Sequence, residues 1–207
     1  FQPLYRLYFG SVHRVIGLEN GINGMVWYKL LDDLLKIEYL VPGIHMRHIP
    51  LVEYVPIVNG VAPEDKLIRV NIREQKVYAY EGEKLVLETN VSTGIPELNG
   101  PGEISTATPY GDFNVSIKVP FRHMGDGAVT SEVGAYELPG VPWVTFFTET
   151  GVAFHGTYWH DNYGNEMSHG CVNMRTEEAK WIYRWTTPVV ETGEWNAKGY
   201  GTRILVE

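Results

Sequence analysis

The sequence contains a single cysteine, Cys171, so no disulfide can form within the chain. It has no apolar run approaching the ~20 residues that a membrane-spanning helix needs. It also lacks a tract of clustered Lys and Arg, and its 17 basic and 25 acidic residues leave a net charge of −8. Because phosphate contacts need clustered basic side chains, the sequence argues against a nucleic-acid-binding protein as well as a membrane-spanning one.

The remaining composition is that of a packed globular protein. The chain has 207 residues, which allows one or two domains, and 44% of them are hydrophobic. It is long enough to bury a core without disulfides. Its 22 glycines and 12 prolines indicate many turns and short strands. The chain begins at Phe1 rather than at Met, which is compatible with a processed chain whose export signal has been removed.

Turn-forming residues divide the chain near position 60. Residues 59–65 combine turn formers, a proline and charges, a pattern typical of a linker. We therefore expect a module at 1–60, a linker at 61–65 and a domain at 66–207. Within the module, residues 30–40 fit either a helical turn or a long loop. Three aromatic or β-branched runs predict a small antiparallel barrel or meander: residues 4–9, 12–16 and 25–30.

The domain at 66–207 has the pattern of short strands with little helix. Ile68, Val70 and Ile72 alternate with polar residues, which predicts a half-buried strand. Residues 77–89 read as a hairpin. Further short strands are expected at residues 113–119, 143–147, 151–155 and 202–206. The predicted fold class is mainly β with one or two helices.

One helix is predicted to begin at Thr176. The Thr176 hydroxyl can cap it, and the two glutamates that follow favour the positive end of its dipole. The residues expected in the core are Ala179, Trp181, Ile182, Tyr183 and Trp185.

Reactive side chains gather just before this helix. Three of the seven histidines and the only cysteine lie within 17 residues. The positive N-terminal end of the helix would lower the pKa of the Cys171 thiol and favour the thiolate. His155 and His169 are candidate acid/base partners for such a nucleophile. Gly156 and Gly170 allow tight turns, and the amides around Cys171 could donate to an oxyanion.

Three interpretations of this cluster stay open from the residues alone. In the first, Cys171 is a small buried hydrophobe and the histidines bond to backbone carbonyls. In the second, Cys171 is a nucleophile activated by a histidine. In the third, the cluster binds zinc, although its spacings do not match the usual zinc patterns. The zinc ligands would be His155, His160, His169 and Cys171.

Several motifs resemble those of one enzyme family. Residues 168–173 read Ser-His-Gly-Cys-Val-Asn, with His155 and Gly156 upstream. This pattern resembles the signature of the L,D-transpeptidase (YkuD-type) catalytic domain. The resemblance extends over about 66–207. Other segments that resemble the family, in order, are Val-Ser-Thr-Gly at 91–94, Thr-Pro-Tyr-Gly-Asp-Phe at 108–113 and the closing strand at 201–206.

The resemblance implies a cysteine acyltransferase. Cys171 would attack the carbonyl after the third residue of a peptidoglycan stem peptide, release the terminal D-amino acid and leave a thioester. An amine of a neighbouring stem would resolve the thioester into a 3→3 cross-link, whereas water would give carboxypeptidation. His155 would be the acid/base, and His169, its rival for that role, an orienting residue. Amides around Gly170 would form the oxyanion hole, supported by Gly156.

The same resemblance assigns supporting roles. Ser168 is expected to hydrogen-bond a histidine. Residues 118–136 resemble a mobile flap over the active site, with apolar side chains and glycine hinges. Two of the candidate substrate contacts, Trp143 and Tyr158, are aromatic and could instead belong to the core. The candidate substrate contacts are Asn173, Met124, Tyr158 and Trp143.

The module at 1–60 resembles bacterial SH3-like domains, chiefly through Trp27 and Tyr28 after a glycine-bearing turn. Such a module would bind cell-wall peptide or orient the catalytic domain. The expected architecture is thus a small SH3-like barrel followed by a β-sandwich-like L,D-transpeptidase domain.

The expected partners follow from the family. They are peptidoglycan stem peptides, with carbapenem-type β-lactams as covalent inhibitors, in an exported and cell-wall-associated protein. No metal or organic cofactor is expected. The alternatives are an L,D-carboxypeptidase on the same scaffold, a non-catalytic wall-binding module, or a zinc hydrolase.

Overall fold

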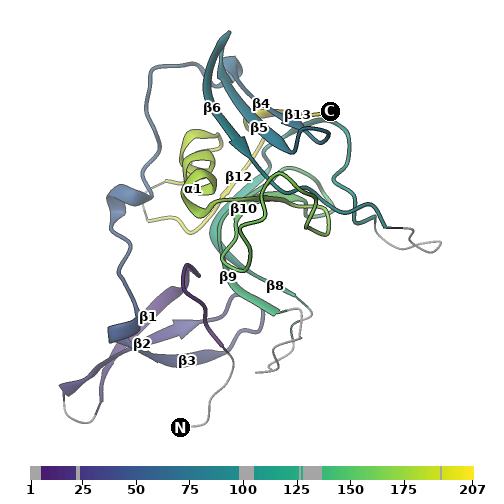
Figure 1. Cartoon of the computed structure of the whole chain (residues 1–207). Helices are drawn as coiled ribbons and strands as arrows, with labels where there is room; N and C mark the ends of the chain where they lie inside the picture. Colours follow the sequence, from purple (N-terminus) through teal and green to yellow (C-terminus); the bar gives the residue numbers. More distant parts are fainter. Residues whose placement is uncertain (1–5, 22–23, 98–104, 126, 128–136, 192) are drawn as a thin grey trace. The chain divides into compact units, whose positions relative to one another are not determined.

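The computed structural model describes residues 6–21, 24–97, 105–125, 127, 137–191 and 193–207. The chain forms two compact units, each built from two segments (Figure 1). The first unit comprises Phe1–Tyr54 and Phe121–Val141, and the second comprises Val55–Pro120 and Pro142–Glu207. The first unit therefore takes in a stretch of the region that the sequence analysis assigned to the domain at 66–207.

The first unit contains an open antiparallel sheet in the order β1-β2-β3, drawn in purple in Figure 1. Its strands are β1 (Arg14–Asn20), β2 (Val26–Leu31) and β3 (Glu38–Pro42). Short 3-10 turns follow at η2 (Gly43–His45) and η3 (Leu51–Glu53).

This sheet corrects part of the sequence prediction. The described residues form an antiparallel meander, which was the alternative to a barrel, and they show no closed barrel, so the SH3-like module is not confirmed. Residues 6–9 of the first predicted strand are not a strand, and residues 1–5 lie outside the described part. The third strand instead begins within residues 30–40, where only a turn or loop was expected.

One five-stranded sheet of the second unit has the order β6-β5-β4-β13-β7. Ile68 and Val70 are fully buried and alternate with half-buried neighbours, which confirms the predicted strand, although it ends at Asn71. The predicted hairpin is also confirmed, with its turn at Gly82. The strands are β4 (Lys66–Asn71), β5 (Lys76–Glu81), β6 (Lys84–Asn90), β7 (Gly111–Asn114) and β13 (Arg203–Val206).

The second sheet has the order β11-β10-β9-β8-β12. Its strands β10 and β11 are parallel, and they flank the reactive cluster. The strands β8 and β9 are longer than predicted and extend from the second unit into residues of the first. The strands are β8 (Ile117–Gly125), β9 (Glu137–Phe146), β10 (Ala153–Gly156), β11 (Val172–Met174) and β12 (Ala197–Lys198).

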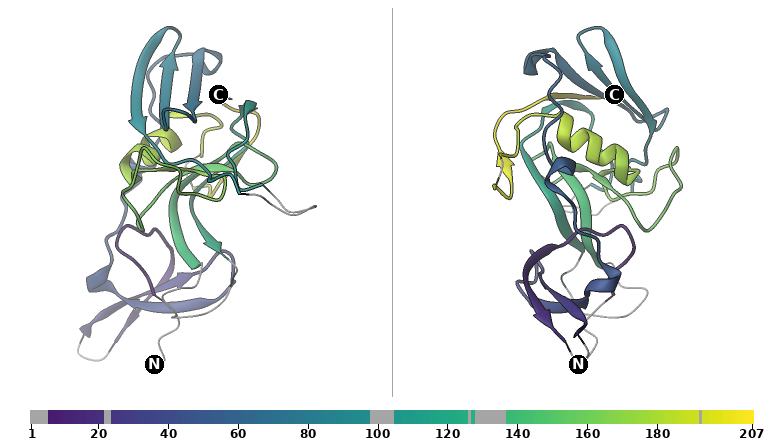
Figure 2. Two further views of the ribbon diagram at one scale, coloured as in Figure 1. Left: turned by 45° about the vertical axis from the view of Figure 1, so that its right-hand side comes forward. Right: turned by 90° about the vertical axis from the view of Figure 1, so that its left-hand side faces the viewer.

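The predicted helix is confirmed as α1 (Thr176–Trp185), which lies between the two sheets of the second unit (Figure 2). Its Tyr183 ring packs 5.3 Å from Trp143 of β9, and its Trp185 indole donates a hydrogen bond to Glu81 of β5. Trp181 is only half-buried and stacks on Trp185, so its assignment to the core was too strong. Within the described ranges, no helix is long and apolar enough to cross a membrane.

The two ends of α1 differ from expectation and from each other. Thr176 is the first helical residue and not the cap, because Arg175 occupies the N-cap position without a side-chain hydrogen bond. At the other end, the buried Lys66 and Lys118 donate hydrogen bonds to the carbonyls of Trp185 and Thr186, at 2.9 and 2.7 Å. These amines satisfy carbonyls at the end of the helix, and burial lowers the pKa of both, that of Lys118 to about 7.

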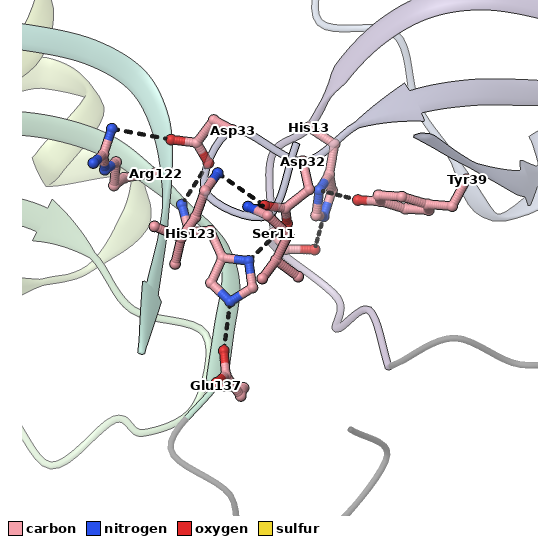
Figure 3. Close-up of polar contacts among 10 residues, drawn as sticks. Ser11, His13, Asp32, Asp33, Tyr39, Arg122, His123 and Glu137 are labelled. Carbon is pink, nitrogen blue, oxygen red and sulfur yellow. Dashed lines mark hydrogen bonds and ion pairs between the residues drawn. The ribbon is translucent and has the colours of Figure 1, made fainter. Parts of the chain in front are cut away.

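The first unit buries a charged cluster around His123 of β8 (Figure 3). The imidazole donates from Nδ1 to Asp32 at 2.6 Å and from Nε2 to Glu137 at 2.7 Å. Asp33 accepts from the His123 amide at 2.8 Å and pairs with Arg122 at 3.3 Å. Burial lowers the pKa of His123, but the hydrogen bonds and charges of the two carboxylates outweigh it, so the pKa is raised.

Candidate active site

The parallel pairing of β10 with β11 brings the main candidate residues to one face of a sheet. His155 is the register partner of Asn173, and Cys171 lies directly before β11. Register partners point to the same side of a sheet, and so do residues two apart in one strand. The Cys171 thiol donates to the carbonyl oxygen of Gly151, two residues before β10, at 3.9 Å, and the Ala153 backbone of β10 also acts on the sulfur. The thiol therefore lies beside β10 on the face that carries the imidazole.

His155 is held as a neutral base. Its ring is buried, and Nδ1 lies 3.1 Å from the carbonyl oxygen of Gly156. Because a carbonyl can only accept, Nδ1 carries the proton and Nε2 carries the lone pair. Burial lowers the pKa of His155 to about 4. A Cβ on Gly156 would approach Pro142 and Thr176 to 2.9 Å, so glycine lets β10 pass close to the start of α1.

Cys171 is a protonated thiol at neutral pH. The residue is half-buried, and burial raises the pKa of the thiol to about 11. The predicted lowering by the helix dipole is therefore wrong. Four residues, the three of β11 and Arg175, separate Cys171 from the first turn of α1, and the dipole acts only over that turn.

Ser168 shapes the loop that carries the thiol. Its hydroxyl donates to the carbonyl of Cys171 and accepts from the amide of Gly170 at 3.2 Å. The predicted hydrogen bond from Ser168 to a histidine is thus not the contact found. Gly170 has a φ of +119°, a conformation that L side chains rarely adopt. The Ser168 hydroxyl and this glycine together close the turn into β11.

A second segment braces the same loop from the side. Ser92 and Asn173 exchange two backbone hydrogen bonds of 2.9 and 2.8 Å, and Ile95 donates to the Ser168 carbonyl at 2.9 Å. A Cβ on Gly94 would lie 2.7 Å from the Gly170 nitrogen, so the two backbones pack directly together. This contact gives the Val-Ser-Thr-Gly motif at 91–94 a physical role that its sequence alone did not reveal.

Asn173 forms a hydrogen bond with His160, which the sequence analysis considered only as a zinc ligand. Its buried side-chain amide donates to Nε2 of His160 at 2.8 Å. The His160 Nδ1 is buried with no hydrogen-bond partner in the described part of the chain. Burial lowers the pKa of His160. The Trp159 ring contacts those of His155 and His160, at 5.8 and 6.1 Å between centroids.

The other predicted site residues lie in varied environments. His169 is exposed in the loop before Gly170, and Tyr158 is half-buried with its ring edge-on to Trp159. Trp143 is buried against Tyr183, as in the core alternative.

The predicted flap is described only in part. Met124 is half-buried in β8 and belongs to the first unit, whereas the cysteine belongs to the second. The flap residues 118–125 form part of β8, and residues 126 and 128–136 lie outside the described part.

The geometry leaves the zinc interpretation without support. Among the described residues, no group of three or more His, Cys, Asp or Glu side chains is placed to hold a metal ion.

Comparison with known proteins decides the family. The model of the YkuD L,D-transpeptidase catalytic domain matches residues 65–206. The chain belongs to this family. The L,D-transpeptidase assignment made from the motifs is thereby confirmed, whereas the SH3-like module receives no such support.

Individual L,D-transpeptidases are similar at lower identity. YciB of Bacillus subtilis (strain 168) is 25% identical over 126 residues, which are 56% of this chain and 58% of that protein. The chain thus spans less than two thirds of that relative. The structure of LD transpeptidase LdtMt1 in complex with imipenem is 15% identical, with a TM-score of 0.53 over 95% of this chain and 78% of that one. A cysteine-to-serine mutant of the Enterococcus faecium L,D-transpeptidase is 26% identical, with a TM-score of 0.51 over 70% and 50%.

Proposed function

We propose that the protein is a peptidoglycan L,D-transpeptidase that forms 3→3 cross-links through a cysteine thioester. Cys171 is the nucleophile and His155 is the acid/base. The substrate is a stem peptide whose third residue supplies the acyl group, and the acceptor is an amine of a neighbouring stem. Because this substrate lies outside the cell membrane, the proposal includes export of the protein.

The pairing of β10 with β11 carries this proposal. In this pairing, the thiol of Cys171 and the imidazole of His155 fall on one face of the sheet, and the thiol lies beside the strand that carries the imidazole. The Gly156 carbonyl holds the imidazole in the tautomer whose Nε2 can accept a proton. A neutral base next to a thiol is the arrangement that nucleophilic catalysis needs.

The pKa values define how acylation proceeds. With the pKa of Cys171 near 11 and that of His155 near 4, the resting pair is a neutral thiol and a neutral imidazole. The proton must therefore move to His155 Nε2 as Sγ bonds to the carbonyl carbon and the π electrons pass to oxygen. Collapse of this oxyanion breaks the C–N bond, and the leaving amine takes the proton from Nε2.

The thioester is then resolved in the opposite direction. The acceptor amine bonds to the carbonyl carbon and gives its proton to Nε2. The C–S bond breaks, and the proton returns to Sγ. Water in place of the amine would give the L,D-carboxypeptidase reaction.

Acylation by a β-lactam is the direct test. Imipenem, the ligand in the LdtMt1 complex, is incubated with the wild type and with the Cys171→Ala, His155→Ala and His169→Ala variants, and intact masses are followed over time. We expect an adduct on the wild type and none on Cys171→Ala. Acylation of His155→Ala should be slower by about 100- to 10,000-fold, the usual contribution of general acid–base catalysis, and slower than that of His169→Ala.

A second assay separates the reactions. Purified disaccharide-tetrapeptide is supplied, and products are resolved by mass. Dimers linked between third residues support transpeptidation, whereas tripeptide monomers alone would assign the carboxypeptidase activity. A folded wild type that gives neither products nor adduct contradicts the proposal and favours a non-catalytic wall-binding module.

A further inference from the structure

A buried threonine outside the signature motif fixes the loop that carries the nucleophile. Thr108, which is 2% exposed, lies between β6 and β7 in sequence. Its hydroxyl donates to the carbonyl oxygen of Gly170 at 2.8 Å and accepts from the amide of Gly94 at 2.8 Å. The hydroxyl proton of Thr108 therefore points at the Gly170 carbonyl oxygen, and the hydroxyl oxygen accepts from the Gly94 amide.

The bond to the Gly170 carbonyl has a consequence on the other side of the same peptide. A trans peptide is planar, with its C=O and N–H pointing in opposite directions. The Gly170–Cys171 bond is trans. Thr108 draws the carbonyl of Gly170 toward the protein interior, so the Cys171 N–H is directed the opposite way.

The Cys171 amide is also the donor that stays available. The neighbouring Gly170 amide is bonded to the Ser168 hydroxyl at 3.2 Å. In the described ranges of the chain, the Cys171 amide has no acceptor. Gly170 has a positive φ, and a glycine backbone rotates more freely than that of other residues. A contact from another segment is therefore needed to fix the orientation of the Gly170–Cys171 peptide.

We propose that Thr108 is a positioning residue that aims the Cys171 amide at the oxyanion of the acylation step. This inference rests on the proposed function. In that step Sγ bonds to the carbonyl carbon, its proton passes to His155, and the oxygen gains the electron pair that the amide hydrogen then stabilises. A donor aimed in advance lowers the barrier because it needs no reorganisation when the charge develops.

The test compares two reactions of the same thiol. Acylation by imipenem passes through an oxyanion, whereas alkylation by iodoacetamide is a direct displacement that forms none. Both rates are measured by intact mass for the wild type, Thr108→Val and Thr108→Ser. Thr145→Val is the matched control, because Thr145 is fully buried and its hydroxyl has no partner in the described residues.

We expect Thr108→Val to slow acylation at least about tenfold, and by no more than the roughly 100- to 1,000-fold that loss of a whole oxyanion donor costs. Its alkylation rate should match the wild type. Thr108→Ser keeps the hydroxyl and should acylate like the wild type, as should Thr145→Val. If Thr108→Val does not fold, Thr108→Ala removes the same hydroxyl without adding a methyl clash.

Two results would overturn the inference while leaving the proposed function standing. One is a hydroxyl-free Thr108 variant that acylates at the wild-type rate. The other is an equal fall in acylation and alkylation, which would mean that Thr108 only shapes access to the thiol. A wild type that alkylates but never acylates would instead overturn the proposed function, and this inference with it.

Discussion

At the scale of single residues, burial determines the protonation states of Cys171 and His155. The sequence predicted that Cys171 pairs with His155 and that the dipole of the following helix favours the thiolate. The structure instead buries both partners, which raises the pKa of Cys171 to about 11 and lowers that of His155 to about 4. Desolvation depends on the packing of distant segments, so sequence spacing alone could not reveal it.

This protonation state makes a prediction about thiol reactivity. Below its pKa, the thiolate fraction grows about tenfold per pH unit. The rate at which iodoacetamide alkylates Cys171 should therefore climb steadily from pH 6 to pH 9 without levelling off. The measurement is the alkylation rate by intact mass, with Cys171→Ala as the unreactive control. A plateau near neutral pH would reveal a preformed thiolate–imidazolium pair and contradict this account.

At the scale of elements, the predictions succeeded where the contacts are local. The alternation in β4, the hairpin of β5 and β6, and the stripe of α1 are all properties of neighbouring residues. The first unit was harder to predict because it combines the N-terminal segment with residues 121–141. Hydrophobic periodicity describes neighbouring residues only, so it could not predict that residues 121–141 belong to the same unit as the N-terminal segment.

The brace between the 91–94 segment and the nucleophile loop gives an element-scale prediction. In Gly94→Ala, the new Cβ would lie 2.1 Å from the Thr106 carbonyl oxygen and 2.7 Å from the Gly170 nitrogen. Both are backbone atoms, so the two segments must separate. We expect a loss of about 1–3 kcal/mol in unfolding free energy, measured by urea titration, together with slower acylation.

Gly17→Ala is the control for this prediction. Its added Cβ would meet only the Lys29 side chain, at 3.6 Å, which is an ordinary contact. It should leave both stability and acylation close to the wild type. Equal stability in the Gly94 and Gly17 variants would show that the brace tolerates separation and would remove this explanation for the motif.

At the scale of the whole molecule, the chain crosses between its two units through β8 and β9. Within the first unit, His123 of β8 joins Asp32, which is 91 residues earlier, to Glu137 at the start of β9. The charged groups that face it are Asp32, Asp33, Arg122 and Glu137. His13 also lies near, and burial lowers its pKa to about 4, so it stays neutral there. The imidazolium is thus the cation at the centre of this cluster, beside the Arg122–Asp33 pair.

The raised pKa of His123 fixes the sign of its pH dependence. A group whose folded pKa exceeds its unfolded value stabilises the fold fully below that unfolded value, about 6.5 for histidine. This stabilisation is lost as the pH rises through the folded pKa. The stability difference between wild type and His123→Asn should therefore be largest near pH 6 and shrink at alkaline pH. The limit for one proton is about 1.4 kcal/mol per pH unit.

Proton NMR of the His123 ring makes this test specific to the cluster. The wild-type midpoint should lie above about 6.5, and Glu137→Gln should lower it, because one of the two stabilising carboxylates is lost. Urea unfolding across pH 6–9 supplies the stability difference. A midpoint at or below the unfolded value would mean that burial outweighs the two carboxylates. The cluster would then join the two segments of the first unit through the one N–H that a neutral imidazole carries, and the stability difference would not depend on pH in this direction.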